Sequence, residues 1–348
     1  MHSLIVLTLV VTVVLSIRPE DDLHLLLEQE SAEGLNKFDS SGRSLLVEAA
    51  AHGRFAFVEA MIATKTVALD IRDKHKGVTA LIASIRGGHH HIAELLLEAG
   101  ASTNVGDRDA TTPVMMACKL GASTLAEQMI KKGADVAVVD NNGYNALMYA
   151  AVSGDANIMQ MILDLVQHNQ GVNMKSKNDG KTALLVAASN AHWEVVQILI
   201  KHGVSLDDQA NSDGFAAIHF AAGQGTHEVV QSLIEHGAEV NTYSKQYGQS
   251  PLYLAVKSSA IKTVQALLKA GADPNKANNE GSTALMAAAE AGHDNCAHEL
   301  LVAGAAVDAQ LPSGHTALML AAANGHEHVA RVLIEAGASV DRGCHRGG

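Results

Sequence analysis

The feature that most constrains the fold is a short pattern, G-x-[ST]-[AP]-L-x-x-A-A-x-x-G, that returns along almost the whole chain. Successive copies are spaced by 33 to 37 residues. A fixed period of this length is typical of repeat proteins, in which each copy is one small supersecondary unit. The pattern occurs nine times, with its first glycine or that glycine's substitute at Gly42, Gly77, Ala110, Gly143, Gly180, Gly214, Gly248, Gly281 and Gly314.

One unit of the pattern predicts two helices. The Thr or Ser two residues after the first glycine can cap the first helix, because its hydroxyl accepts an N–H that the helix leaves unpaired. The second helix carries apolar residues at helical spacing, as Val229, Val230 and Leu233 do. A glycine then ends it, since glycine adopts a positive φ at little cost. These glycines are Gly100, Gly133, Gly203, Gly237, Gly271, Gly304 and Gly337.

The composition agrees with close packing of small side chains. Of the 348 residues, 47% are apolar but only 3% are aromatic, so the core must be built from Ala, Leu and Val. Alanine pairs such as Ala187-Ala188 and Ala221-Ala222 let neighbouring helices approach closely. A single helix pair is too small to bury its own apolar stripe. We therefore expect the units to stack into one domain with a continuous core.

The clearest copies, GSTALMAAAEAGH from Gly281 and GHTALMLAAANGH from Gly314, resemble the ankyrin repeat. The resemblance covers about residues 39–341, with repeats starting near 39, 74, 107, 140, 177, 211, 245, 278 and 311. It implies an all-α solenoid of stacked helix-turn-helix units with projecting β-turn or hairpin fingers. Residues 17–38, which contain LHLLLEQ, look like a half-repeat that caps the N-terminus, and 342–348 form a C-terminal tail.

The pattern is weaker at four places, where we expect local fraying or a bend. Ala110 replaces the turn glycine, and Ser84-Ile85 replaces the alanine pair of the second repeat. The first repeat lacks the terminal glycine near Thr64 to Val67. The fourth repeat ends in the longer segment MILDLVQHNQGVNMKSK.

The N-terminus carries an apolar run without charge from Leu4 to Leu15. It is too short to span a membrane, which takes about twenty apolar residues, and its length is that of a signal peptide. We predict that residues 1–16 are a signal peptide cleaved after Ser16. An uncleaved membrane anchor, a wrongly assigned start and an apolar strand on the first repeat are alternatives. The chain is accordingly secretory or extracellular if the signal holds, and cytoplasmic otherwise.

Charge and cysteine content exclude several classes of function. The net charge is −12, and no run of Lys and Arg suits a phosphate backbone, so we expect no nucleic-acid partner. Cys118, Cys296 and Cys344 lack the spacing of metal ligands. We expect Cys118 and Cys296 to be buried free thiols and Cys344 to be the one reactive cysteine.

The nineteen histidines invite a metal or catalytic interpretation, but most have a place in the repeat. His89, His192, His293 and His326 open the second helices. The tightest clusters, His89-His90-His91 and His326-Glu327-His328, put neighbouring rings on different sides of a helix. Gly180-Lys181-Thr182 lacks the earlier glycine of a phosphate-binding loop. We therefore expect no catalytic, cofactor or metal site, and a histidine-dependent metalloprotein or enzyme stays a remote alternative.

The remaining informative residues are those that leave the repeat consensus on the concave face and the finger tips, where members of the family bind proteins. Aromatic rings are typical anchors of protein interfaces. We predict a partner-binding patch made of Tyr144, Lys181, Phe215 and Tyr247, with Gln224 and Lys257 behind it. The alternative is that these rings lie flat on the adjacent finger. A further candidate anchor is Trp193, for which packing against a neighbouring repeat is an equal alternative.

These observations predict a non-catalytic scaffold or adaptor that binds a protein partner through its concave face and finger tips. We expect it to act as a monomer. A secreted or membrane-tethered adaptor is the alternative if the apolar N-terminal segment directs or holds it, and a membrane contact is expected only if that segment is retained.

Overall fold

The computed structural model describes residues 32–39, 42–165 and 171–341. These residues form helices joined by turns, and among them an isolated antiparallel bridge between Phe38 and Ser44 stands in place of a named strand. The all-α fold class is confirmed. The predicted signal peptide (1–16), most of the predicted N-terminal cap and the predicted C-terminal tail with Cys344 lie outside the described residues.

The chain divides into two compact units, residues 1–165 and 166–348, and each is taken by itself. The helices of the first unit are α3 (Ala32–Leu35), α4 (Leu45–Ala51), α5 (Phe55–Ala63), α6 (Ala80–Arg86), α7 (His90–Glu98), α8 (Pro113–Leu120), α9 (Ser123–Lys131), α10 (Ala146–Ser153) and α11 (Ala156–Leu165). Those of the second unit are α12 (Ala183–Ser189), α13 (Trp193–Lys201), α14 (Ala217–Gly223), α15 (His227–Glu235), α16 (Pro251–Lys257), α17 (Ile261–Lys269), α18 (Ala284–Ala291), α19 (Asp294–Val302), α20 (Ala317–Ala323) and α21 (Glu327–Glu335).

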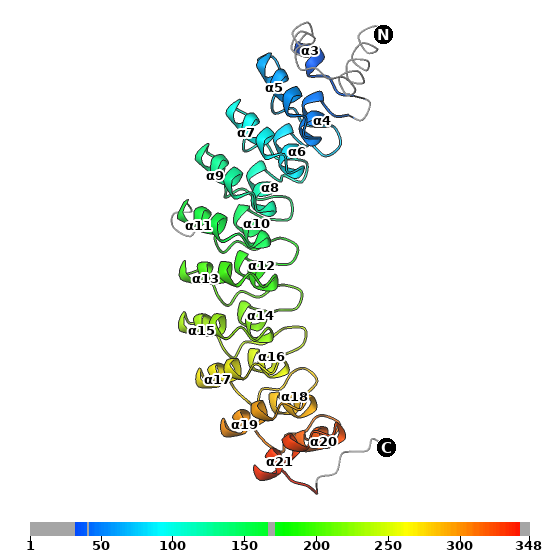
Figure 1. Cartoon of the computed structure of the whole chain (residues 1–348). Helices are drawn as coiled ribbons and strands as arrows, with labels where there is room; N and C mark the ends of the chain where they lie inside the picture. The colour runs from blue at the N-terminus through cyan, green and yellow to red at the C-terminus, as the bar shows by residue number, and fades with distance from the viewer. Residues whose placement is uncertain (1–31, 40–41, 166–170, 342–348) are drawn as a thin grey trace. The chain divides into compact units, whose positions relative to one another are not determined.

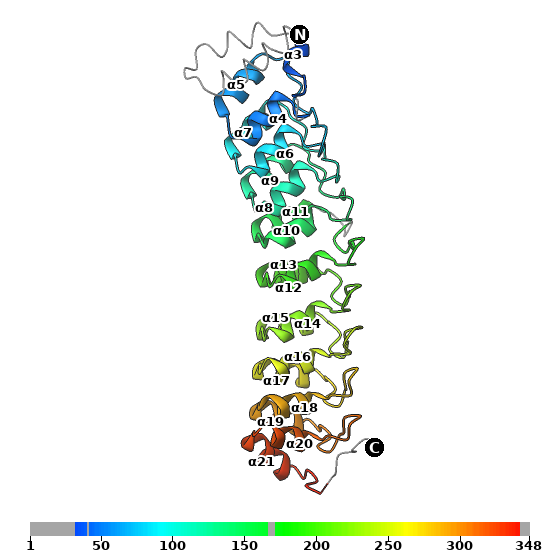
Figure 2. The same ribbon diagram turned by 90° about the vertical axis from the view of Figure 1, so that its right-hand side faces the viewer.

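Within each unit the helices form two columns in sequence order (Figure 1). In the first unit the first helices of the repeats, α4, α6, α8 and α10, pack on one another, and so do the second helices α5, α7, α9 and α11. In the second unit the first helices also pack on one another, and these are α12, α14, α16, α18 and α20. The second helices do the same, and these are α13, α15, α17, α19 and α21. In each unit the fingers project to one side of the columns (Figure 2). The predicted stacking of neighbouring repeats is therefore confirmed within each unit.

The predicted caps are present at the first helices. Ser44, Thr79, Thr112, Thr182, Ser250, Thr283 and Thr316 each accept the backbone N–H three residues later. In the fourth repeat Asn145 takes this role, and its Oδ1 lies 2.9 Å from the nitrogen of Met148. The polar residue two positions after the turn glycine thus sets where these first helices begin.

The first helix of the sixth repeat is capped differently, because the side chain of Ala216 cannot accept a hydrogen bond. Here the Nδ1 of His219 accepts the N–H of Ala216 at 3.0 Å. The Nε2 of His219 lies 3.2 Å from the carbonyl oxygen of Gln249, to which it can only donate. The ring is 1% exposed, and burial lowers its pKa to about 4. The folded protein therefore holds His219 neutral, with its proton on Nε2.

Small side chains fill the space between the first helices. Ala187, Ala188, Ala221 and Ala222 are all fully buried. In the last repeat Ala321 is also buried, but Ala322 is exposed because no further repeat covers it among the described residues. A core of this kind needs few rings, in agreement with the composition.

Within each unit, two sets of hydrogen bonds tie fingers to the repeat that follows. At the tips, backbone N–H groups donate to carbonyls of the preceding finger, for example Arg108 to Lys76 at 2.8 Å and Asn279 to Tyr247 at 3.0 Å. Near the end of most repeats, an Asn or Asp side chain accepts a backbone N–H of the next repeat. The pairs include Asp70 with Ser102, Asn104 with Asp135, Asn173 with Ser205, Asp207 with Glu239, Asn241 with Asp273 and Asn275 with Ala306.

The irregularity expected at the weak copies is absent from α6 and α8, which have the same form as the other first helices. Ala110 adopts the positive φ of the glycines it replaces, +62° against +67° for Gly77. In the first repeat Lys65 takes the terminal left-handed position with a φ of +56°. In the fourth repeat α11 ends at Leu165, residues 166–170 lie outside the described part, and Gly171 has a φ of +87°.

The strained turn at Ala110 predicts that Ala110→Gly stabilises the protein. A left-handed conformation costs an L-residue about 1–2 kcal/mol. Glycine avoids this cost, but it loses more conformational entropy on folding than alanine does, which costs about 0.5–1 kcal/mol. We expect the free energy of unfolding in urea to rise by roughly 0.5–1 kcal/mol. Ala266→Gly, the same change in the middle of α17, should lower it by about 1 kcal/mol; a loss of stability in both variants would contradict the strain at Ala110.

The buried neutral His219 predicts a stability that depends on pH. Unfolded histidine takes up a proton near pH 6.5, whereas the folded ring does so only near pH 4. Between these values the unfolded chain binds more protons, so the free energy of unfolding falls as the pH falls, by up to about 3 kcal/mol. Urea melts across this window should be flatter for His219→Met. Methionine occurs at the same register in the third repeat, where the Sδ of Met115 accepts the N–H of Thr112 at 3.5 Å.

If the free energy of unfolding changes with pH equally in the wild type and in His219→Met, the pH dependence comes from the other histidines.

Candidate functional site

A cluster of rings lies on the fingers and first helices of the second unit. The Phe215 ring stacks on His219 with 5.3 Å between ring centres, and it meets Phe220 edge-on at 5.5 Å. Tyr247 of the next finger lies 6.5 Å from Phe215. The structure therefore brings together Phe215 and Tyr247, two of the predicted patch residues, and adds Phe220 and the capping histidine.

The turns place these rings. Phe215 follows the positive-φ Gly214, and its N–H donates to Oδ1 of Asp213 at 3.0 Å. Tyr247 precedes the equivalent Gly248, and its carbonyl accepts the N–H of Asn279 at 3.0 Å. Since both backbones are fixed by finger hydrogen bonds, the two side chains are held next to one another before any partner arrives.

The two rings differ in how much of them is open to a partner. Phe215 is half-buried on its own helix and on Tyr247, in line with the alternative that the rings lie on the adjacent finger. Tyr247 keeps 47% of its surface exposed. Tyr247 thus presents the more open ring, and Phe215 packs beneath it.

Tyr243, on the same finger as Tyr247, is an exposed ring that sequence reasoning missed. It is 52% exposed, and the ammonium of Lys276 lies 4.6 Å from its ring centre. Its carbonyl accepts a hydrogen bond from the side chain of Gln209 at 3.1 Å. The signal that could have found it is a second tyrosine in a single finger, NTYSKQYG.

The polar members of the predicted patch belong to the repeats that carry these rings or to the repeat before them. Lys181 is half-buried on the preceding finger, with its Nζ 3.8 Å from Oδ2 of Asp179. Gln224 is the exposed C-cap of α14, and Lys257 is the exposed last residue of α16. All three lie in the second unit with Phe215 and Tyr247.

The remaining two candidates are Tyr144 and Trp193. Tyr144 belongs to the first unit, where its half-buried ring lies 5.5 Å from Tyr149. The Tyr149 hydroxyl donates to Oδ2 of Asp140 at 2.7 Å, and burial together with this carboxylate raises the Tyr149 pKa. Trp193 is the half-buried first residue of α13. Partner binding by any of these residues stays a prediction.

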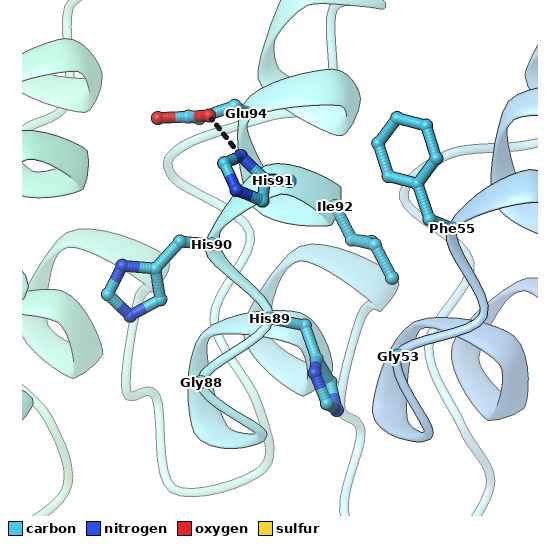
Figure 3. A pocket seen from close by; sticks show the side chains of 8 residues that line it. All are labelled: Gly53, Phe55, Gly88, His89, His90, His91, Ile92 and Glu94. Atoms are coloured by element: carbon cyan, nitrogen blue, oxygen red, sulfur yellow. Dashed lines mark hydrogen bonds and ion pairs between the residues drawn. The ribbon is translucent and has the colours of Figure 1, made fainter.

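The histidine cluster of the first unit lines an open pocket of about 760 Å³ beside Phe55. Figure 3 shows the three rings pointing in different directions, with His91 facing Glu94 at 3.4 Å. His89 turns back to the preceding repeat, where its Nε2 lies 3.2 Å from the carbonyl oxygen of Ala51. A Cβ on Gly53 would come within 2.6 Å of this ring. His89 therefore acts as a packing group between two repeats.

The described residues hold no group of three or more His, Cys, Asp or Glu side chains placed to bind a metal ion. Cys118 and Cys296 are free and buried, as predicted. Burial raises the pKa of the Cys118 thiol to about 12 and also raises that of Cys296. Neither thiol is available as a nucleophile at neutral pH.

In the part of the chain that is described, every helix is too short or too polar to cross a lipid bilayer. The apolar segment from Leu4 to Leu15 lies outside that part, so the signal peptide, its alternatives and the compartment stay predictions.

Comparison with known proteins agrees with the geometry of the repeats. The family model described as "Ankyrin repeats (3 copies)" matches residues 20–107, 46–140, 102–173, 163–244, 202–278 and 252–343. The chain is also similar to the Ankyrin repeat and KH domain-containing protein mask-1 of Caenorhabditis elegans, with 30% identity over 156 residues. That match covers 44% of this chain but only 6% of the relative. Ankyrin repeats are protein-interaction modules and are generally non-catalytic. Because the family model matches nearly the whole chain, this protein belongs to the ankyrin repeat family.

Proposed function

We propose that this protein is a non-catalytic scaffold or adaptor that binds a protein partner through the fingers and first helices of its second unit. The supporting observation is the pair of exposed tyrosines, Tyr243 and Tyr247, on one finger beside the half-buried Phe215. Tyrosine offers a large contact area with few rotatable bonds, and it is enriched among the residues that dominate binding energy.

The surroundings of Tyr247 suit an interface. Gln224 and Lys257 are exposed polar residues at the C-terminal ends of α14 and α16, the first helices of the two repeats that carry the rings. An interface with an aromatic centre and a polar rim is the usual arrangement in protein complexes. Lys181, beside Asp179, contributes to this rim on the other side of Phe215.

Preorganisation is the physical advantage of such a surface. The finger hydrogen bonds and the stacked helices fix the positions of the rings before binding, so little conformational entropy is lost when a partner docks. A rigid array of aromatic and polar side chains of this kind is suited to the recognition of a partner.

The proposal predicts that Tyr247→Ala weakens partner capture while it leaves the fold intact. The immobilised full chain is used to recover binding proteins from cells that make it, and each recovered protein is quantified by mass spectrometry. Loss of a central aromatic anchor costs about 2 kcal/mol or more, which is about thirtyfold in Kd. Far-ultraviolet circular dichroism should be unchanged, because the Tyr247 side chain is 47% exposed.

Phe55→Ala is the matched control, because Phe55 is a similarly exposed ring, at 42%, on the first unit. Proteins whose recovery falls with Tyr247→Ala but not with Phe55→Ala bind at the proposed surface. Equal recovery by the wild type and by Tyr247→Ala would refute the proposal for this surface.

A further inference from the structure

A second surface, which we call the basic groove, lies in the first unit between two neighbouring repeats. It is an open groove of about 650 Å³ lined by Lys76, Arg86, Arg108, Met116, Lys119 and Leu120, together with finger residues that include two aspartates. This volume is within the range of about 300–1,000 Å³ that is usual for ligand sites.

The cations of the basic groove come from four separate segments. Arg86 and Lys119 are in the last turns of α6 and α8, whereas Lys76 and Arg108 lie on the fingers that precede these helices. The fingers are joined by the hydrogen bond from the Arg108 N–H to the Lys76 carbonyl. A guanidinium nitrogen of Arg108 also donates to the carbonyl of Lys74. Stacking of the second and third repeats therefore gathers charges that form no run in the sequence.

The groove has a charge opposite to that of the chain. Four Lys and Arg side chains face two carboxylates, those of Asp107 and Asp109, which leaves a balance of +2 in a protein of net charge −12. Asp107 is only 3% exposed, and its Oδ2 lies 2.6 Å from Arg86. Its Oδ1 accepts the N–H groups of Asp109 and Thr111. Asp107 is thus paired with Arg86, whereas Lys76, Arg108 and Lys119 form no ion pair among the described residues.

The basic groove also offers apolar contact and a fixed cation. Leu120 is 52% exposed, and Met116 contributes the inner surface. The ammonium of Lys119 lies 5.5 Å from the centre of the Tyr149 ring, which holds the side chain in place. Cations around an exposed leucine are complementary to a segment in which acidic residues flank a large apolar one.

We propose that the basic groove binds an acidic segment of a partner protein, in which Asp or Glu residues stand on both sides of a large apolar residue. This proposal rests on the protein-binding function proposed above, but it concerns a different surface and names the chemistry of the ligand. A nucleic acid fits less well. A polyanion needs a long row of cations, whereas this groove has a balance of +2 in a chain that repels polyanions as a whole.

The test measures binding of a fluorescent peptide of about ten residues, with Glu and Asp around a central Leu, to the full chain by fluorescence anisotropy. A peptide with Lys in place of the acids and a single-stranded DNA are compared with it. The variant Lys76→Glu with Lys119→Glu should weaken acidic-peptide binding at least tenfold, because two attractions become repulsions. Binding should also weaken as salt is added, since exposed charges are screened.

The matched control is Lys132→Glu with Lys201→Glu, which makes the same change in net charge at exposed positions ending α9 and α13. Retention of binding by this control, with loss in the groove variant, supports the proposal. The proposal is overturned if both variants bind alike, if the lysine peptide or the DNA binds more tightly, or if the acidic peptide does not bind. A failure here, with capture still sensitive to Tyr247→Ala, would leave the proposed function standing.

Discussion

The structure depends on the contact between neighbouring repeats. A pair of helices as short as α14 and α15 buries its alanines and valines only because the pairs beside it cover them. Stability in such an array is close to a sum of repeat and interface terms. Ala322 of the last repeat follows the same rule. The equivalent alanine is buried in other repeats, but Ala322 is exposed because no further repeat packs on it among the described residues.

The fingers combine rigidity with freedom of sequence. Backbone hydrogen bonds between tips, and the Asn and Asp side chains that accept an N–H from the next repeat, fix their positions. These bonds use main-chain groups or a single Asn or Asp side chain in a repeat, so the other finger side chains can differ without cost to the fold. The fingers therefore carry two surfaces of different chemistry. One finger has Tyr243 and Tyr247, and two others have Lys76 and Arg108.

Much of the fold was predictable from local physics. The polar residue after each turn glycine caps its helix, and the terminal glycines have positive φ. The exceptions follow from tertiary context. Ala110 keeps the glycine conformation because the flanking repeats fix the turn, and His219 replaces a missing cap from within the next helical turn. Of the predicted patch, Phe215 and Tyr247 do lie together, whereas Tyr144 packs on Tyr149 in the other unit.

The sequence by itself determined the repeat, its helices, its caps and its family, because these depend on residues close together in the chain and recur with a fixed period. Only the tertiary structure decided which side chains share a surface. The basic groove joins cations from separate segments of two repeats, and the exposure of Tyr243 against the half-burial of Phe215 depends on what the adjacent finger covers. The charge and the exposure of a surface depend on side chains from neighbouring repeats that are far apart in the sequence. A repeat pattern read along the chain does not show which of these side chains come together.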